Sequence, residues 1–181
     1  MRYIKFSIKH LIATVIGLVF FFLLARFLSF NIFANTNLTL QYAIVGFFAA
    51  AFGPIPGLLI GLIGHALTDL SYGFGIWWSW VIASAFTGLC SGFLLEPGKV
   101  ERGEFGTADT LRFIIGNLVI QAAAWCLIAP GLDILIYGEP ADKVFRQGFV
   151  AGAGNFVITA IFGTLLLAGY ARTRTPPDNL D

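Results

Sequence analysis

Residues 11 to 170 form an almost continuous apolar stretch, which is broken only by short Gly, Pro and Asn segments and one charged segment. Charged residues make up 12% of the chain, against about 25% in an ordinary globular domain. A water-soluble chain of 181 residues cannot present so little charge, so lipid is the expected solvent. The few polar side chains inside the apolar stretch therefore carry most of the functional information.

Six apolar runs are candidates for spanning helices, each of which needs about 20 residues. The runs are continuous rather than alternating, and this favours helices over a β-barrel. The sequence predicts an all-α integral membrane protein, a six-transmembrane-helix bundle that forms a single membrane domain over residues 1–181. The expected spans are residues 11–30, 40–52, 58–72, 77–95, 111–136 and 145–171.

The N-terminal segment resembles a secretory signal peptide, but its apolar run is too long and five more follow, so it is expected to remain as the first span. The distribution of Lys and Arg predicts that both termini are cytoplasmic, because the external loops then contain only Lys143 and Arg146. The external loops, at residues 31–37, 73–75 and 137–143, are short and are expected to cover a cavity open to the outside.

The composition also excludes several kinds of site. The net charge of +1 gives no basis for nucleic-acid binding. Cys90 and Cys126 lie inside apolar runs and are interpreted as free buried thiols, so neither a metal site nor a disulfide framework is expected. No cofactor is expected.

Three polar residues in the first and third runs are candidates for ligand contact. Arg26 lies late in the first run, where it either extends to the lipid headgroups or faces the interior and pairs with an anion. His65 and Asp69 are four residues apart and therefore share a helical face. They form either a structural hydrogen-bonded pair or a direct substrate contact, because no further ligand or nucleophile accompanies them.

A polar stripe marks the fifth run, where Asn117, Gln121 and Trp125 recur every four residues, and Asn155 on the sixth run is positioned to face it. Hydrogen bonding between helices explains this stripe without a ligand. Amides that both donate and accept, together with an indole face, would also suit a planar ligand rich in heteroatoms.

Three tryptophans, Trp77, Trp78 and Trp80, cluster at the start of the fourth run. An aromatic belt at the membrane interface explains them without a ligand. On a helix, however, they fan over roughly 300°, so at least one is expected to point inward.

Small residues recur at helical spacing on three runs and allow helices to approach closely, either inside the protein or against a partner. The pattern is Ala13 and Gly17 on the first run, Gly57, Gly61 and Gly64 on the third, and Gly148, Gly152 and Gly163 on the sixth.

Several of these strings resemble the substrate-binding S components of energy-coupling factor (ECF) transporters, closest to an uncharacterised membrane subgroup allied to the riboflavin-type S components. The resemblance covers most of residues 7–170. Its most specific strings are Gly64-His65-Ala66-Leu67-Thr68-Asp69 and Trp77-Trp78-Ser79-Trp80, with Phe52-Gly53-Pro54 and the segment from Asn35 to Tyr42 in support.

The resemblance implies a six-helix, multi-pass protein of the bacterial cytoplasmic membrane that binds a vitamin near its external face. It also implies docking onto a transmembrane T component driven by two cytoplasmic ATPase subunits, and it adds Asn37 and Gln41 to the candidate substrate contacts. Ala13 and Gly17 match the family's docking motif in position, with Gly where Ala is common. Such a protein is not an enzyme, and no phosphate-binding loop occurs in the sequence.

The sequence therefore predicts an S component for a water-soluble vitamin or related micronutrient, with a planar heteroaromatic such as a flavin or nucleoside-like precursor as the best candidate. A larger ligand such as a cobalamin is an alternative. Two other classes remain open: an intramembrane enzyme that uses His65 and Asp69, and a structural assembly subunit without a ligand.

Overall fold

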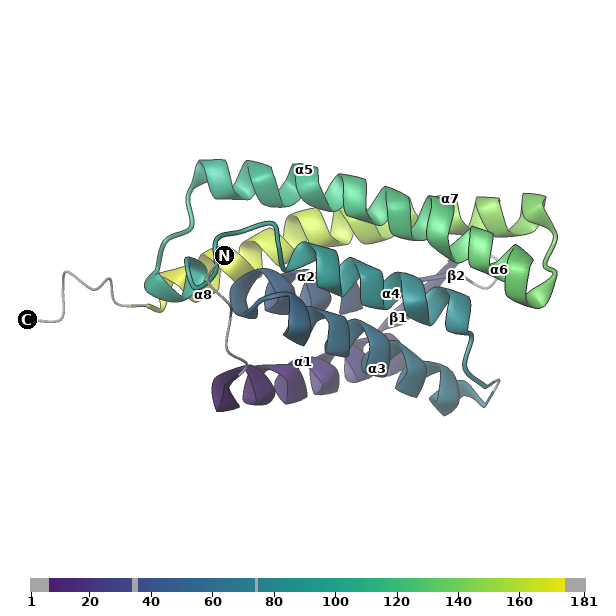
Figure 1. Ribbon diagram of the computed structural model, residues 1–181, viewed down its shortest axis with the longest axis horizontal. Coiled ribbons are helices and arrows are strands. Elements are labelled where there is room, and N and C mark those ends of the chain that lie inside the picture. The colour runs from purple at the N-terminus through teal and green to yellow at the C-terminus, as the bar shows by residue number, and fades with distance from the viewer. Residues whose placement is uncertain (1–6, 34–35, 74, 175–181) are drawn as a thin grey trace, which may run out of the picture.

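The computed structural model describes residues 7–33, 36–73 and 75–174, with the side chains of residues 32, 33, 36 and 37 outside the description. The chain is a bundle of helices with one small β-hairpin (Figure 1). The first half comprises α1 (Ile8–Phe27), β1 (Ser29–Phe33), β2 (Thr36–Thr39), α2 (Gln41–Phe52), α3 (Pro54–Tyr72) and α4 (Trp78–Ser91).

The second half consists of a short 3₁₀ turn and two long helices, each of which contains one π-helical turn. The turn is η1 (Val100–Arg102). The first long helix runs through α5 (Thr107–Ala123), η2 (Ala124–Ile128) and α6 (Ala129–Tyr137). The second runs through α7 (Ala141–Ile158), η3 (Thr159–Gly163) and α8 (Thr164–Arg172).

Four of these helices are long and apolar enough to cross a membrane: Ile8–Phe27, Pro54–Tyr72, Thr107–Tyr137 and Ala141–Arg172. α2 is apolar but has only 12 residues, and α4 has 14. At 1.5 Å per residue these two helices are roughly 18 and 21 Å long, which is less than a hydrocarbon core of about 30 Å. The mostly helical class is confirmed, and a helix overlaps each of the six predicted runs.

Residues 31–37 were expected to form a loop, but the structure places most of them in the hairpin. β1 and β2 pair antiparallel, with Ser29 opposite Thr39 and Asn31 opposite Asn37. The hairpin continues directly into α2, where the hydroxyl of Thr39 accepts a hydrogen bond from the backbone N–H of Gln41 at 3.0 Å. This bond satisfies one of the unpaired donors at the start of the helix.

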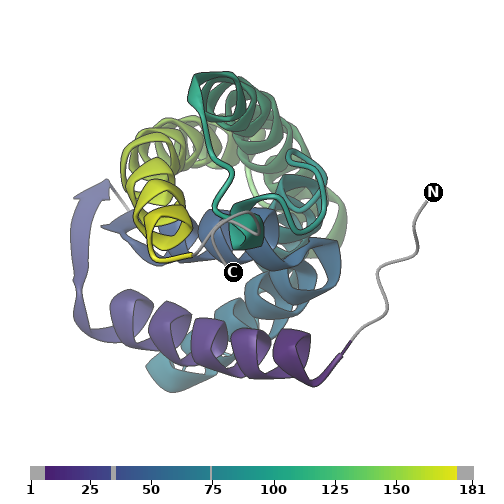
Figure 2. The same cartoon turned by 90° about the vertical axis from the view of Figure 1, so that its left-hand side faces the viewer.

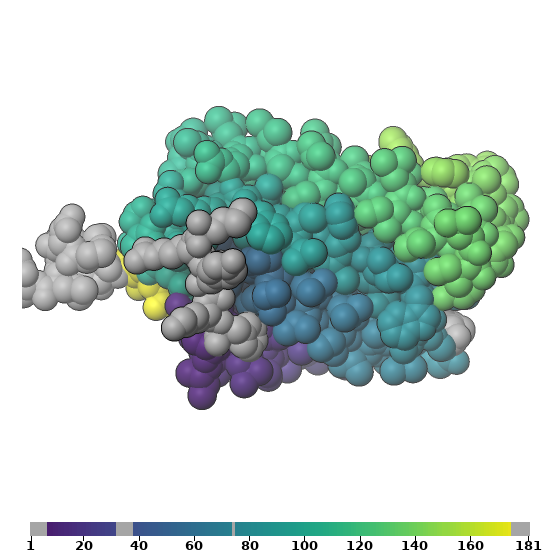
Figure 3. Space-filling model, viewed as in Figure 1, coloured from purple at the N-terminus to yellow at the C-terminus, as the bar shows by residue number. Residues whose placement is uncertain are grey.

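Glycines bring α3 and α4 into close contact. A Cβ atom on Gly57 would lie 2.3 Å from the carbonyl oxygen of Gly88, and one on Gly61 would lie 2.4 Å from that of Ser84. Gly53, with a φ of 101°, allows the sharp turn from α2 into α3. α3, α4 and the α5–α6 helix lie side by side on the face seen in Figure 3.

α1 crosses the other helices at a steep angle (Figure 2). Its buried residues, which include Ala13, Gly17 and Phe21, contact α2 and α3. The opposite face is exposed along the whole helix, from Ile8 to Phe27. Such a face is suited to lipid or to a protein partner.

The charged segment at residues 97–109 lies at the end of the bundle where α5 begins and α8 ends (Figure 1). Lys99 binds Asp109 at 2.8 Å, and Lys9 at the start of α1 binds Glu101 at 2.8 Å. Arg102 also donates a hydrogen bond to Glu104, which lowers the pKa of that carboxyl below its ordinary value. These ion pairs tie α1, η1 and α5 together.

Candidate functional site

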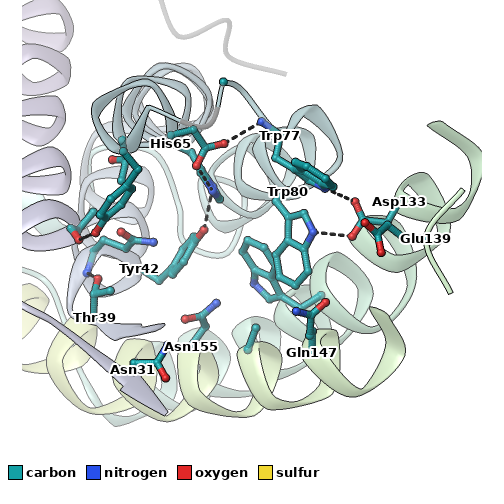
Figure 4. Close-up of a pocket in the computed structure, with 18 of the residues that line it drawn as sticks. Asn31, Thr39, Tyr42, His65, Trp77, Trp80, Asp133, Glu139, Gln147 and Asn155 are labelled. Atoms are coloured by element: carbon teal, nitrogen blue, oxygen red, sulfur yellow. Dashed lines mark hydrogen bonds and ion pairs between the residues drawn. The ribbon is translucent and has the colours of Figure 1, made fainter. Parts of the chain in front are cut away.

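A cavity of about 600 Å³ opens at the opposite end of the bundle, between the hairpin, the α3–α4 turn and the α6–α7 turn. Its walls come from α1, β1, β2, α2, α3, α4, η2, α6 and α7 (Figure 4). The volume lies within the range of roughly 300–1,000 Å³ that is usual for small-molecule sites.

Aromatic rings form the inner wall of the cavity. The Trp125 ring centroid lies 5.5 Å from that of Trp80, 5.0 Å from that of Tyr42 and 6.5 Å from that of His65. Trp125 is only 1% exposed, and its indole N–H donates to the side-chain oxygen of Gln121 at 2.6 Å. Gln121 thus fixes the orientation of the indole rather than lining the cavity.

Trp125 lies in the π-helical turn η2, a local structure that is frequent at functional sites. Pro130 follows one turn later and has no N–H to donate to the preceding turn. A Cβ atom on Gly148 would lie 2.0 Å from the carbonyl oxygen of Trp125, so only glycine lets α7 approach here. The turn and this glycine together set the position of the indole.

Asp133 holds two further tryptophans in place. One carboxylate oxygen accepts hydrogen bonds from the Trp77 indole at 2.6 Å and from the Ser79 hydroxyl, and the other accepts from the Trp80 indole at 2.7 Å (Figure 4). Asp133 is 2% exposed. A carboxylate is an acceptor only, so three donors suit its ionised form.

Asp69 holds the start of α4 from the other side. Its carboxylate accepts the backbone N–H of Trp77 at 2.9 Å and lies 3.6 Å from the His65 ring (Figure 4). The other ring nitrogen of His65 is 3.3 Å from the Tyr42 hydroxyl. The predicted pair of His65 and Asp69 is thus one part of a chain of contacts from α2 through α3 to α4.

The mouth of the cavity carries an ion pair and several amides. Glu139 and Lys143 pair at 2.6 Å, while Gln147 and Asn155 line the wall that α7 provides, and Asn31 lines the hairpin side. The cavity therefore combines aromatic faces, carboxylates and amides. Such a lining can stack against a flat ring and hydrogen-bond its edge.

The structure brings together seven of the predicted substrate contacts in this cavity: Gln41, His65, Asp69, Trp77, Trp80, Trp125 and Asn155. The described lining does not include Arg26, Trp78, Asn117 or Gln121. The side chain of Asn37 lies outside the described part of the chain.

The predicted contacts outside the lining have other neighbours. Arg26 lies over the ring of Tyr72, with 4.9 Å from the guanidinium carbon to the ring centroid. Trp78 is 48% exposed. Asn117 is fully buried. Its amide donates to the carbonyl of Phe113 on the same helix at 3.0 Å and accepts a hydrogen bond from the hydroxyl of Ser91 on α4 at 3.2 Å, so its polar groups are bonded within and between helices.

Sequence reasoning missed several lining residues, above all Tyr42 and Asp133. Asp133 had a readable signal, because it is the one carboxylate inside the apolar stretch from 111 to 136. Tyr42 and Lys143 lie at helix starts and Glu139 lies in a loop, where polar residues are ordinary, whereas Gln147 lies in the second turn of α7. Their place in the wall depends on how the helices meet.

Ala13 and Gly17, the candidates for docking, are buried in this structure. Ala13 is 4% exposed, and a Cβ atom on Gly17 would lie 2.3 Å from the end of the Ile60 side chain. Their small size therefore serves the contact between α1 and α3. Among the described residues, no cluster of His, Cys, Asp and Glu is arranged to hold a metal ion.

Comparisons with known proteins agree with the resemblance seen in the sequence. Residues 5–172 match the family described as ECF-type riboflavin transporter, S component. A UPF0397 protein of Exiguobacterium sp. is 45% identical over 177 residues, which cover 97% of both chains. UPF0397 proteins of Streptococcus pneumoniae R6 and Lactococcus lactis subsp. cremoris are 44% and 45% identical over the same length.

The fold has a solved relative. The crystal structure of FolT bound with folic acid superposes with a TM-score of 0.59 and covers 87% of this chain and 94% of that one, at 14% sequence identity. At this identity the likeness is one of fold alone. With the match over residues 5–172, the chain is a multi-pass membrane protein that belongs to the S-component family of ECF-type riboflavin transporters.

Proposed function

We propose that this protein binds a small, planar, heteroaromatic micronutrient in the 600 Å³ cavity and delivers it as the S component of an ECF importer. The observation that carries this proposal is the cavity wall itself, in which Trp77 and Trp80 are each oriented by a hydrogen bond from the indole N–H to Asp133. Trp125, held by Gln121, packs behind Trp80. Indoles fixed in this way offer a preformed wall to a flat ring.

The cavity volume favours a vitamin or precursor of one to three rings over a cobalamin, which is much larger than ordinary drug-sized ligands. The geometry of the site does not support the alternative of an intramembrane enzyme. His65 and Asp69 contact Tyr42 and the backbone of Trp77, and these contacts position the wall. The family is one of transporter components and not of enzymes.

We further propose that the chain spans the bacterial cytoplasmic membrane six times with both termini inside. The cavity then opens outward, and the charged segment at residues 97–109 faces the cytoplasm, where the partners are expected. The Lys and Arg distribution supports this orientation. The short helices α2 and α4 would be covered by the longer helices, or they would tilt less from the membrane normal than the longer helices do.

The partners proposed are a transmembrane T component and two ATPase subunits, with Ala13 and Gly17 as the docking motif. Because both residues are buried against α3 and α2, docking through them requires α1 to shift within the complex. Cross-linking from Ala13→Cys to the T component would support this use of α1. Cross-links from the exposed Val15→Cys alone would move the docking surface to the outer face of the helix.

Mass spectrometry of the small molecules that co-purify with the protein tests the binding proposal. A single heteroaromatic compound in stoichiometric amount is the expected result. In liposomes the protein alone should bind that compound without altering it, and uptake should require the T component and the ATPases. Chemical conversion by the protein alone would favour an enzyme, and a ligand-free preparation that still assembles would favour a structural subunit.

A further inference from the structure

The formal charges around the cavity do not balance. The described part of the lining contains three carboxylates, on Asp69, Asp133 and Glu139, and a single ammonium group, on Lys143. Lys143 is already paired with Glu139 at 2.6 Å, so these two charges cancel at the mouth. Asp69 and Asp133 remain, one on each side of Trp77.

The charge of Asp133 has no cationic partner in the described structure. Its three hydrogen bonds come from two indoles and a hydroxyl, all of which are neutral donors. Neutral donors stabilise a carboxylate without removing its field, and at 2% exposure little water screens it. A buried charge of this kind is costly unless an opposite charge approaches it.

Asp69 adds to the negative electrostatic potential of the cavity wall. Its partners are the backbone N–H of Trp77 and the ring of His65, at 3.6 Å. If His65 is neutral the two carboxylates leave the wall at −2, and if it is protonated they leave it at −1. The wall is negative in either protonation state of His65.

The aromatic part of the wall also suits a positively charged ligand. The face of a tryptophan ring attracts cations through the ring quadrupole, and tryptophan does so most strongly of the aromatic side chains. Trp77 and Trp80 line the cavity, and the buried carboxylate of Asp133 accepts a hydrogen bond from each indole.

We infer that the ligand is a planar nitrogen heterocycle that carries a positive charge, through a ring nitrogen or an amine, and that Asp69 and Asp133 select it over neutral and anionic rings of the same size. The inference rests on the proposed function, because it concerns the ligand of the same cavity. A neutral flavin ring would stack against the aromatic wall, but it would leave the negative potential of the two carboxylates uncompensated.

Two probes of one shape test this inference. Proflavine is a flat three-ring cation, and lumichrome is a flat three-ring neutral molecule. Binding of each to the purified protein in a nonionic detergent is measured by quenching of tryptophan fluorescence. We expect proflavine to bind at least about tenfold more tightly than lumichrome, a difference of about 1.4 kcal/mol that lies within the range of a cation–π contact.

Asp69→Asn provides the matched test of charge, because the amide keeps an oxygen for the backbone N–H of Trp77. It should reduce the preference for proflavine several-fold while lumichrome binding stays within about twofold. The control is Asp142→Asn, which removes an exposed carboxylate paired with Arg146 at the start of α7, outside the cavity lining. It should leave both affinities unchanged.

The outcomes separate this inference from the proposed function. If the two probes bind equally well to the parent protein, or if Asp142→Asn changes the preference as much as Asp69→Asn does, the charge selection is wrong while the cavity still binds planar rings. If neither probe binds, both the charge selection and the binding of planar heterocycles are contradicted. The comparison of the two probes on the parent protein does not depend on whether any variant folds.

Discussion

Asp133 is the residue on which the shape of the cavity depends most. Its two oxygens join Trp77, Ser79 and Trp80 at the start of α4 to the α6 helix. Two of the three donors are cavity-lining indoles. Since a buried donor without an acceptor costs about 1–3 kcal/mol, the carboxylate and its donors hold one another in position.

Asp133→Ala should therefore destabilise the protein, because three donors lose their acceptor at once. The expected loss is about 3 kcal/mol or more, seen as a clear fall in the thermal midpoint measured by circular dichroism in detergent. Asp142→Ala, at a carboxylate whose side chain is 71% exposed, is the control and should shift the midpoint little. Equal midpoints for the two variants would show that Asp133 does not hold α4.

Trp77 and Trp78 are adjacent in the sequence, but only Trp77 is among the described cavity-lining residues. Trp77 lines the cavity and donates to Asp133, whereas Trp78 is 48% exposed and outside the lining. Trp77→Phe should weaken binding of the co-purified ligand by about tenfold, because a smaller ring remains and the indole bond is lost. Trp78→Phe should change the affinity less than about twofold in the same calorimetric titration. The reverse order of effects would place the site elsewhere.

At the scale of elements, the α3–α4 pair is one of the most constrained contacts. A Cβ atom on Gly88 would lie 2.0 Å from the carbonyl oxygen of Gly57, and backbone atoms cannot move aside as a flexible side chain can. The same pair carries His65 and Asp69 on α3 and Trp80 on α4. The glycine contact therefore sets how far apart these cavity residues lie.

Gly88→Ala should force α3 and α4 apart and cost about 1–3 kcal/mol. The matched control is Gly169→Ala in α8, where a Cβ atom would meet nothing within 4 Å. That change should be neutral or stabilising by about 0.5–1 kcal/mol, because alanine favours the helix. Thermal unfolding of both variants decides the matter: a Gly88→Ala protein as stable as the Gly169→Ala protein would contradict this packing.

At the scale of the whole molecule, hydrophobic runs predict the helices because burial in lipid requires long apolar segments with every backbone group satisfied internally. The hairpin was not predicted, because the segment around Asn31 is rich in polar residues that are common in turns. The segment is also too short to show a clear alternation of apolar and polar residues. On the α6–α7 side, the loop at residues 137–143 was expected to cover a cavity, but Glu139 and Lys143 were not among the predicted contacts. Glu139 and Lys143 acquire their role only where two helices meet in space.

The candidate site was predicted in part, and the reason differs from residue to residue. Trp125 and Asn155 stood out because an amide or an indole in an apolar run needs an explanation. Gln121 lies on the same stripe, yet it points to Trp125 and Thr159 within the helix packing. Spacing along one helix identifies a polar face, but it does not tell which member of that face reaches a cavity.

The membrane orientation is a property of the whole chain and has its own test. Glu104→Cys and Asp142→Cys, each in a chain with Cys90 and Cys126 replaced by Ala, place single thiols at opposite ends of the bundle. An impermeant thiol reagent should label the thiol at position 142 in intact cells and the thiol at position 104 only after permeabilisation. Labelling in the opposite order would reverse the orientation.

Native mass spectrometry of the purified protein tests the central claim, that this cavity holds a small molecule, most directly. Ala151 lines the cavity, and Ala153 lies exposed two residues further along α7. The parent protein and Ala153→Trp should each carry one small-molecule adduct per chain. Ala151→Trp, which fills the cavity, should carry none while keeping the same thermal midpoint to within a few degrees. An adduct retained by a folded Ala151→Trp protein, or absent from all three, would contradict the account.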